Sequence, residues 1–281
     1  MLSLLNYIIW NPDTDIFRMG GFALRWYSTC WIFALLSGYL TVRYLFRRYN
    51  IEDKKFEPLF LYCFFGVLIG ARLGHCLFYQ PDYFLATRQH FVEMLLPIHY
   101  LPDGSWKFIG YEGLASHGGV IGLLAAFWLY GKKTKVPFLF TVDAVAVAAP
   151  FAAMFIRLGN LMNSEIIGRV TDVPWAFIFE RVDMQPRHPG QLYEAVFYLL
   201  TGIIGIILFK KTMLKKSLGT GVYFGYCIAM CFTFRFFIEF LKEVQEDFEQ
   251  GLAIDMGQIL SIPLAIAGFW LIYRGIKKIK Q

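Results

Sequence analysis

Several charged side chains stand within or beside the long apolar runs of this sequence. They are Arg72, Arg157, Glu194, Arg235 and Glu239. A charge at the centre of a membrane costs roughly 2.5–3.5 kcal/mol on insertion scales, so an ionisable residue in an apolar helix is a candidate for function. Arginine stays charged and presents several N–H donors, which suits a phosphate group. These residue types therefore predict a site for a phosphate-bearing ligand.

The densest group of polar residues spans residues 156–169, which read IRLGNLMNSEIIGR. Arg157 and Asn160 are three residues apart, so they share one face if the segment is helical. Glu165 and Gly168 follow in the same segment. We expect these residues to line one polar site.

Two further motifs point to the same chemistry. In residues 187–194, RHPGQLYE, Pro189 suits the first position of a helix, whose free N–H groups and dipole favour an anion. In the motif SHGG, His117 precedes two glycines that would let a substrate approach the backbone. Alternatives stay open, because His117 also fits a hydrogen-bonded histidine at a helix end. Arg235 and Glu239 are four residues apart and also fit a simple ion pair within one helix.

The elements that must position these residues are membrane-spanning helices. About twenty apolar residues cross a bilayer as a helix, which satisfies its own backbone hydrogen bonds. Seven stretches qualify, near Trp26–Phe46, Leu59–Tyr79, Gly113–Tyr130, Phe138–Ile156, Leu192–Phe209, Val222–Phe240 and Met256–Tyr273. The sequence predicts an all-α integral membrane protein with seven transmembrane helices, forming a single domain over residues 1–281.

Loop charges predict the orientation of these helices. Lysine and arginine gather in every second connection, which places those connections in the cytoplasm. The N-terminus is then outside, in the periplasm, and the C-terminus is cytoplasmic. Segments near residues 81–112, 157–190 and 242–255 form a small outer head region. In this topology the polar residues converge on the outer leaflet, namely Arg72, Arg157, Arg235, Glu239, Tyr27, His117, His188 and Gln258.

Composition excludes several classes of protein. At 57% hydrophobic and 17% charged residues, the chain is too apolar for a water-soluble domain of 281 residues. The net charge of +6 comes from lysines and arginines scattered between apolar runs, so no nucleic acid is expected as a partner. The five cysteines lie in apolar stretches without ligand spacing, and neither a metal nor a cofactor is predicted.

Residues 156–169 resemble the signature of the bacterial prolipoprotein diacylglyceryl transferases, usually GRxGNFxNxExxGR. Further motifs resemble this family in the same order along the chain: LRWYS, GARLGHCLFY, SHGGVIG, RHPGQLYE, FRFFIEF and MGQILSIP. The resemblance implies transfer of a diacylglyceryl group from phosphatidylglycerol to the lipobox cysteine of a preprolipoprotein signal peptide, which forms a thioether and releases glycerol 1-phosphate. It also implies a multi-pass protein of the bacterial cytoplasmic (inner) membrane, surrounded by membrane lipid, whose active site faces the outer leaflet.

The resemblance also implies roles for the matching residues. The catalytic set would be Arg157, Arg235, His117, Tyr27 and Asn160. The set that binds phosphatidylglycerol would be Arg157, Arg235, Asn160, Glu165, Gly168, Arg72, Glu239 and His188. His117 would accept the thiol proton, unless a neighbouring arginine lowers the thiol pKa instead, and the sequence leaves both open.

The chain departs from the family pattern at a few positions, which are Ile156 for Gly, Leu161 for Phe, Ser164 for Gly, and residues 242–245, KEVQ, for Arg-x-Pro-Asp. These changes alter packing and the outer loop. The alternative function is a seven-helix transporter or channel for an anionic or lipid substrate. Such a protein would place polar groups at mid-membrane and often show internal repeats. Neither pattern is present in the sequence.

Overall fold

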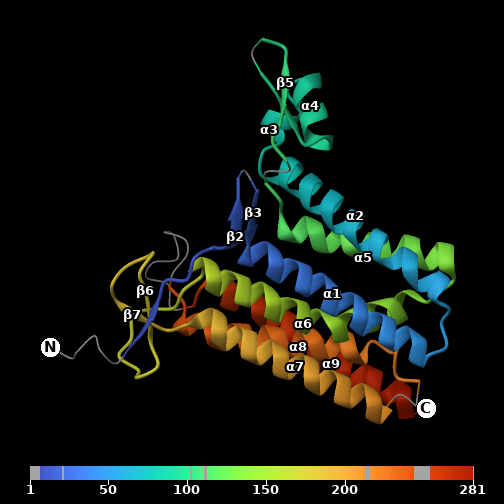
Figure 1. Ribbon diagram of the computed structural model, residues 1–281. Coiled ribbons are helices and arrows are strands. Elements are labelled where there is room, and N and C mark those ends of the chain that lie inside the picture. Colours follow the sequence, from blue (N-terminus) through green and yellow to red (C-terminus); the bar gives the residue numbers. More distant parts are fainter. Residues whose placement is uncertain are drawn as a thin grey trace. The chain divides into compact units, whose positions relative to one another are not determined.

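The computed structural model describes residues 7–20, 22–101, 103–110, 113–212, 216–243 and 254–280. Long helices make up most of this part of the chain (Figure 1). The chain divides into two compact units. Unit 1 comprises Met1–Leu45 and Val142–Gln281, and unit 2 comprises residues 46–141.

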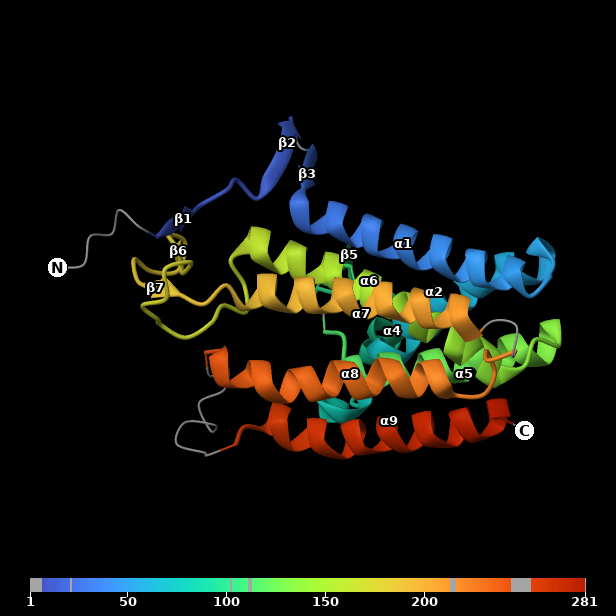
Figure 2. The same ribbon diagram turned by 90° about the horizontal axis from the view of Figure 1, so that it is seen from below.

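Unit 1 holds most of the long helices. They are α1 (Trp26–Arg48), α6 (Phe138–Asn163), α7 (Gly190–Thr212), α8 (Val222–Ile238), the short 3-10 helix η3 (Glu239–Leu241) and α9 (Met256–Lys280), of which α1 and α6 run a few residues into unit 2. Helices α8 and α9 lie side by side (Figure 2). They pack closely at Gly268, where an added carbon would lie 2.8 Å from Ala229 Cα. Phe197 of α7 stacks on Phe234 of α8, with ring centroids 3.9 Å apart.

Unit 1 also contains short strands. Strand β1 (Ile8–Trp10) pairs in parallel with β6 (Phe177–Phe179), and β6 pairs antiparallel with β7 (Pro186–Arg187). Strands β2 (Asp15–Met19) and β3 (Phe22–Arg25) form a separate antiparallel hairpin. The three-stranded sheet packs on a small apolar core, made of Leu161, Ile167, Phe177 and Phe179.

Unit 2 is built on two long helices that cross closely. Its elements are α2 (Asp53–Phe78), α3 (Pro81–Phe84), α4 (Arg88–Leu95), β4 (Ile98–Tyr100), β5 (Trp106–Phe108) and α5 (Ser116–Thr134). A carbon added at Gly74 would lie 2.8 Å from Gly118 Cα, and one added at Gly122 would lie 2.8 Å from Gly70 Cα. Glycines at four-residue spacing therefore let α2 and α5 pack backbone against backbone.

The coarser part of the predicted fold class is confirmed, because the described residues are mostly helical and their long helices suit a membrane protein. Among the residues that the structure describes, six helices are long and apolar enough to cross a membrane, namely α1, α2, α6, α7, α8 with η3, and α9. Helix α5 forms over the seventh stretch, but its polar ends, with His117 at one end and Lys132 and Lys133 at the other, keep it below the six in hydropathy. The seventh span stays a prediction. The short strands correct the all-α expectation, because extended segments outside the helices pair with one another.

Candidate active site

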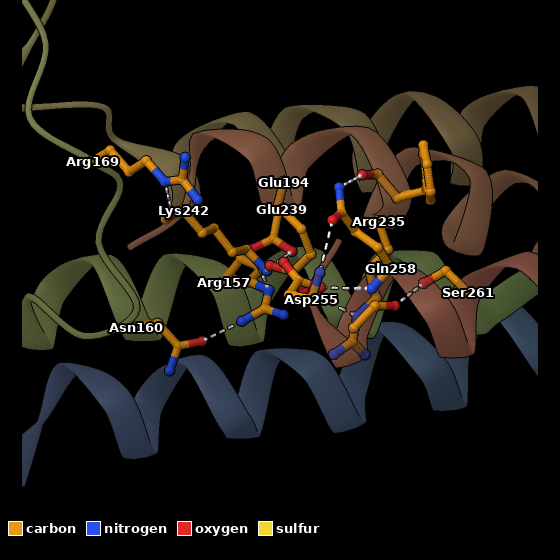
Figure 3. A network of polar contacts seen from close by, with 12 residues as sticks. Arg157, Asn160, Arg169, Glu194, Arg235, Glu239, Lys242, Asp255, Gln258 and Ser261 are labelled. Atoms are coloured by element: carbon orange, nitrogen blue, oxygen red, sulfur yellow. Dashed lines mark hydrogen bonds and ion pairs between the residues drawn. The ribbon is translucent and has the colours of Figure 1, made fainter. Parts of the chain in front are cut away.

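A series of ion pairs, in which cations alternate with carboxylates, runs through the predicted site in unit 1 (Figure 3). Glu194 of α7 is almost fully buried, and its two carboxylate oxygens face different cations. Oε2 lies 3.0 Å from Arg157 Nε, close enough for an ion pair although the angle is not that of a hydrogen bond. Oε1 lies 3.2 Å from Lys242 Nζ. Glu194 thus joins the end of α6 to the segment that follows η3.

The same series of ion pairs continues to α8. Lys242 Nζ lies 3.3 Å from Glu239 Oε2, and the other oxygen of Glu239 accepts a hydrogen bond of 3.2 Å from Arg235 Nε. Arg235 and Glu239 do form the ion pair that their spacing permits, but Glu239 also binds Lys242. The pair therefore belongs to a larger network. A carbon added at Gly257 would lie 2.8 Å from Glu239 Oε1, so the start of α9 packs against this carboxylate.

Helix α6 continues past the predicted end of its apolar stretch, and this extension carries the signature side chains. Arg157 Nη1 donates a long hydrogen bond of 3.4 Å to Asn160 Oδ1, and Asn160 Nδ2 donates to Glu165 Oε2 at 3.0 Å. Gln191 of α7 donates to the Glu165 carbonyl at 2.6 Å. These bonds fix the turn after α6, where Ser164 and Glu165 leave the helix.

The backbone around Gly168 places Lys242 at the site. The Gly168 N–H donates to the His188 carbonyl at 3.0 Å, and the Arg169 N–H donates to the Leu241 carbonyl at 2.9 Å. Arg169 Nε also donates to the Lys242 carbonyl at 2.8 Å. A carbon added at Gly168 would lie 2.5 Å from His188 Cβ, so only glycine fits here. In this structure Gly168 thus allows the two backbone segments to pack closely.

Two other predicted residues lie in unit 1. A carbon added at Gly159 would lie 3.0 Å from the Tyr27 ring, which puts Tyr27 of α1 beside the turn of α6 between Arg157 and Asn160. His188 Nδ1 lies 3.2 Å from the Tyr193 hydroxyl, and partial burial lowers the pKa of the His188 imidazole. His188 therefore supports the Gly168 turn through its backbone while its ring contacts α7.

The remaining predicted residues, Arg72 and His117, belong to unit 2. Arg72 donates to the Glu93 carbonyl at 2.7 Å and to the Met94 carbonyl at 3.2 Å, and its guanidinium lies 4.8 Å from the centre of the Phe84 ring. These contacts tie α4 to α2. His117 is exposed at the second position of α5. The participation of both residues in the reaction stays a prediction.

Sequence reasoning missed Lys242 as a site residue and named it only as a departure from the family pattern. Its spacing of three from Glu239 was a usable signal for their contact. Its contact with Glu194 depends on the backbone bridge between residues 168 and 242, which no local pattern reveals. The predicted outer segment at 242–255 lies mostly outside the described residues.

The arrangement favours binding of an anion. Three cations, Arg157, Lys242 and Arg235, alternate with two carboxylates, so the chain of contacts carries an excess of positive charge. Lys242 is buried, whereas the Arg235 side chain is 48% exposed and the Arg157 side chain 23% exposed. The two arginines can therefore meet a ligand. Within the described ranges, no three His, Cys, Asp or Glu side chains gather as metal ligands.

Comparison with known proteins agrees with this chemistry. The family model described as prolipoprotein diacylglyceryl transferase matches residues 14–274. The phosphatidylglycerol–prolipoprotein diacylglyceryl transferase of Bacteroides fragilis is 55% identical over 279 residues, covering 99% of each chain. The protein of that name from Chloroherpeton thalassium is 39% identical over 97% of this chain and 96% of its own. The one from Porphyromonas gingivalis is 36% identical over 98% and 97%. This chain therefore belongs to the prolipoprotein diacylglyceryl transferase family.

Proposed function

We propose that this chain is a transferase that moves the diacylglyceryl group of phosphatidylglycerol to the lipobox cysteine thiol of a prolipoprotein. The product is a thioether and the leaving group is glycerol 1-phosphate, as the first step of lipoprotein maturation. The observation that carries the proposal is the single network that joins Arg157 of α6 to Arg235 of α8. Relatives that bear the name of this reaction match nearly the whole chain.

The bonds that change explain why two arginines are needed. A C–S bond forms at the diacylglyceryl carbon while the C–O bond to phosphate breaks. The electron pair of that bond leaves on the phosphate oxygen, and the thiol loses its proton. N–H donors aimed at this oxygen stabilise the charge that develops there. A thiol with a pKa of about 8.5 is largely protonated at neutral pH, so the site must also favour the thiolate.

We assign roles on this basis. Arg157 and Arg235 hold the phosphate and stabilise its departure, with Asn160 and Tyr27 on the phosphate or glycerol oxygens. Asn160 and Tyr27 lie beside Arg157 near the end of α6, and Arg157 belongs to the network of ion pairs, which supports this assignment. His117 takes the thiol proton, an assignment that rests on its residue type and on the family motif. Supporting roles in lipid binding fall to Glu165, Glu239, Gly168, His188 and Arg72.

The membrane arrangement is part of the proposal. Residues 1–281 are proposed as one domain in the bacterial inner membrane, with seven spans, the N-terminus in the periplasm, the C-terminus in the cytoplasm, and the site at the outer leaflet. Six long apolar helices support a multi-pass protein. Loop charge supports the orientation. Reporter fusions at Thr134 and Gln250 test it, because opposite sidedness is expected and the same sidedness would contradict it.

The direct test uses the purified full-length protein, phosphatidylglycerol and a lipobox peptide. We expect mass spectrometry to detect the peptide with a diacylglyceryl thioether, together with free glycerol 1-phosphate. A peptide with Cys→Ser at the lipobox is the matched control and should give no thioether. No product from the cysteine peptide, or equal product from both peptides, would contradict the proposed function.

A further inference from the structure

Lys242 lies at the centre of the charge network, although the proposed reaction gives it no task. Its ammonium sits 3.2 Å from Glu194 Oε1 and 3.3 Å from Glu239 Oε2. Only 7% of its side chain is exposed, beside 1% for Glu194 and 12% for Glu239. A ligand in the site would therefore meet the arginines before it met Lys242.

The position of Lys242 is set by the last part of the signature segment. Residues 168 and 242 form a β-bridge, and the Glu243 N–H donates to the Ile167 carbonyl at 3.3 Å. Arg169 Nε holds the Lys242 carbonyl at 2.8 Å. These bonds leave the lysine side chain pointing toward Glu194 and Glu239 (Figure 3).

Each carboxylate that binds Lys242 also binds one of the two arginines. Glu194 faces Arg157, and Glu239 faces Arg235. Buried charges are costly to leave unpaired, so a carboxylate that lost Lys242 would draw more strongly on its arginine. The positive charge offered to an anion would fall at the same time. Among the described residues, Lys242 is the one that forms an ion pair with both carboxylates, so it links the two halves of the site.

We propose that Lys242 is a positioning residue, which binds Glu194 and Glu239 so that Arg157 and Arg235 present their guanidinium groups to one lipid phosphate. This inference rests on the proposed function and deepens it. Lys242 acts through the two carboxylates and does not touch the reacting atoms. Its removal is therefore expected to weaken the use of phosphatidylglycerol and to spare the use of the lipobox peptide.

The test is Lys242→Met in the full-length protein, with initial rates measured against phosphatidylglycerol and against lipobox peptide in turn. We expect the KM for phosphatidylglycerol to rise about tenfold or more, which is the effect of losing about 1.4 kcal/mol of interaction. The KM for the peptide is expected to stay within about twofold. Lys107→Met, which removes an exposed lysine of β5, is the matched control and should change neither KM.

Two more variants separate positioning from a loss of folding. Lys242→Arg keeps the charge and should restore the KM for phosphatidylglycerol to within about threefold. Lys242→Met combined with Glu194→Gln removes the carboxylate that would be left unpaired, and it should recover part of the loss. An unchanged lipid KM in Lys242→Met would overturn the inference. So would an equal rise of both KM values with no rescue by either variant. If the parental protein forms no thioether, the proposed function itself fails.

Discussion

At the scale of single residues, Gly168 shows how size alone shapes the outer part of the site. Its neighbours are the His188 Cβ and carbonyl and the Leu241 carbonyl, all within 2.8 Å of the position that a side-chain carbon would take. Backbone atoms cannot move aside as a flexible side chain can. Gly168 thus packs the signature segment closely against the residues before α7 and the end of η3, and its role in lipid binding stays a prediction.

Gly168→Ala should lower both stability and transfer. Forcing a methyl group into a packed region typically costs about 1–3 kcal/mol, and the shift of residue 242 should reduce transfer at least about tenfold. Thermal unfolding in detergent and initial rates measure the two effects. Gly38→Ala in α1 is the matched control, because nothing lies within 4 Å of the added carbon. A Gly168→Ala protein with parental stability and rate would contradict the packing role.

His188 predicts a pH dependence of stability. Burial lowers the pKa of its imidazole below the ordinary value of 6.5, so the unfolded chain takes up the proton first as the pH falls. The free energy of unfolding should therefore be unaffected by His188 above about pH 6.5 and should decrease as the pH drops toward the lowered pKa. His188→Asn should flatten this decrease, as measured by denaturation from pH 7 to pH 5. An equally steep decrease in His188→Asn would contradict the assignment.

At the scale of elements, α6 connects two polar sites. Its far end carries Arg157 and Asn160, and near its start Asp143 is fully buried. The Asp143 carboxylate accepts N–H bonds from Gly219, Gly221 and Phe224 at 2.8–2.9 Å. These groups lie just before and within the first turn of α8. Asp143 therefore fixes where α8 starts relative to α6.

Asp143→Ala should destabilise the protein by at least about 2 kcal/mol, because it leaves buried N–H groups without an acceptor. Since α8 also carries Arg235, transfer should decrease as well. Thermal unfolding in detergent, followed by initial rates below the melting temperature, measures both. Asp172→Ala, at an exposed position, is the control and should leave stability within about 0.5 kcal/mol. A variant as stable as the parent would show that α8 needs no such anchor.

The helices could be predicted from sequence because an apolar run is a local signal. Six of the expected spans form long apolar helices, although α2 already begins at Asp53 and α6 continues to Asn163. The short strands could not be predicted in this way. Strand β1 pairs with β6, far along the chain, and Val170 bridges Arg187. Such pairs depend on where the fold places the ends of the helices. A strand of two or three residues is also too short to show a periodic pattern in the sequence.

The candidate site was predictable to the same degree. Arg157, Arg235 and Glu239 were marked by charge in apolar surroundings, and Asn160 and Glu165 by their place in the polar segment 156–169. The structure joins these residues through hydrogen bonds and ion pairs in unit 1. The part that Lys242 plays was not predictable, because it follows from a backbone bridge to Gly168. Lys242 lies outside the apolar runs, so no cost of burying a charge in the membrane marked it as a candidate.

At the scale of the whole molecule, the proposed reaction depends on charges that several helices contribute. In the proposed function, Arg157 of α6 and Arg235 of α8 act together on one lipid phosphate, and Lys242 positions them. Separate helices bring them together through Glu194 and Glu239, so neither arginine works alone. Groups that act as a unit show strongly non-additive effects when they are removed together.

The most direct measurement is therefore a double-mutant cycle on kcat/KM for phosphatidylglycerol with Arg157→Ala, Arg235→Ala and the double variant. Each single variant should lose about 10²–10³-fold. The double variant should lose little more than the worse single variant, because one phosphate loses its binding in each case. A loss in the double variant equal to the product of the two single losses would contradict the account, and so would a parental rate in Arg157→Ala.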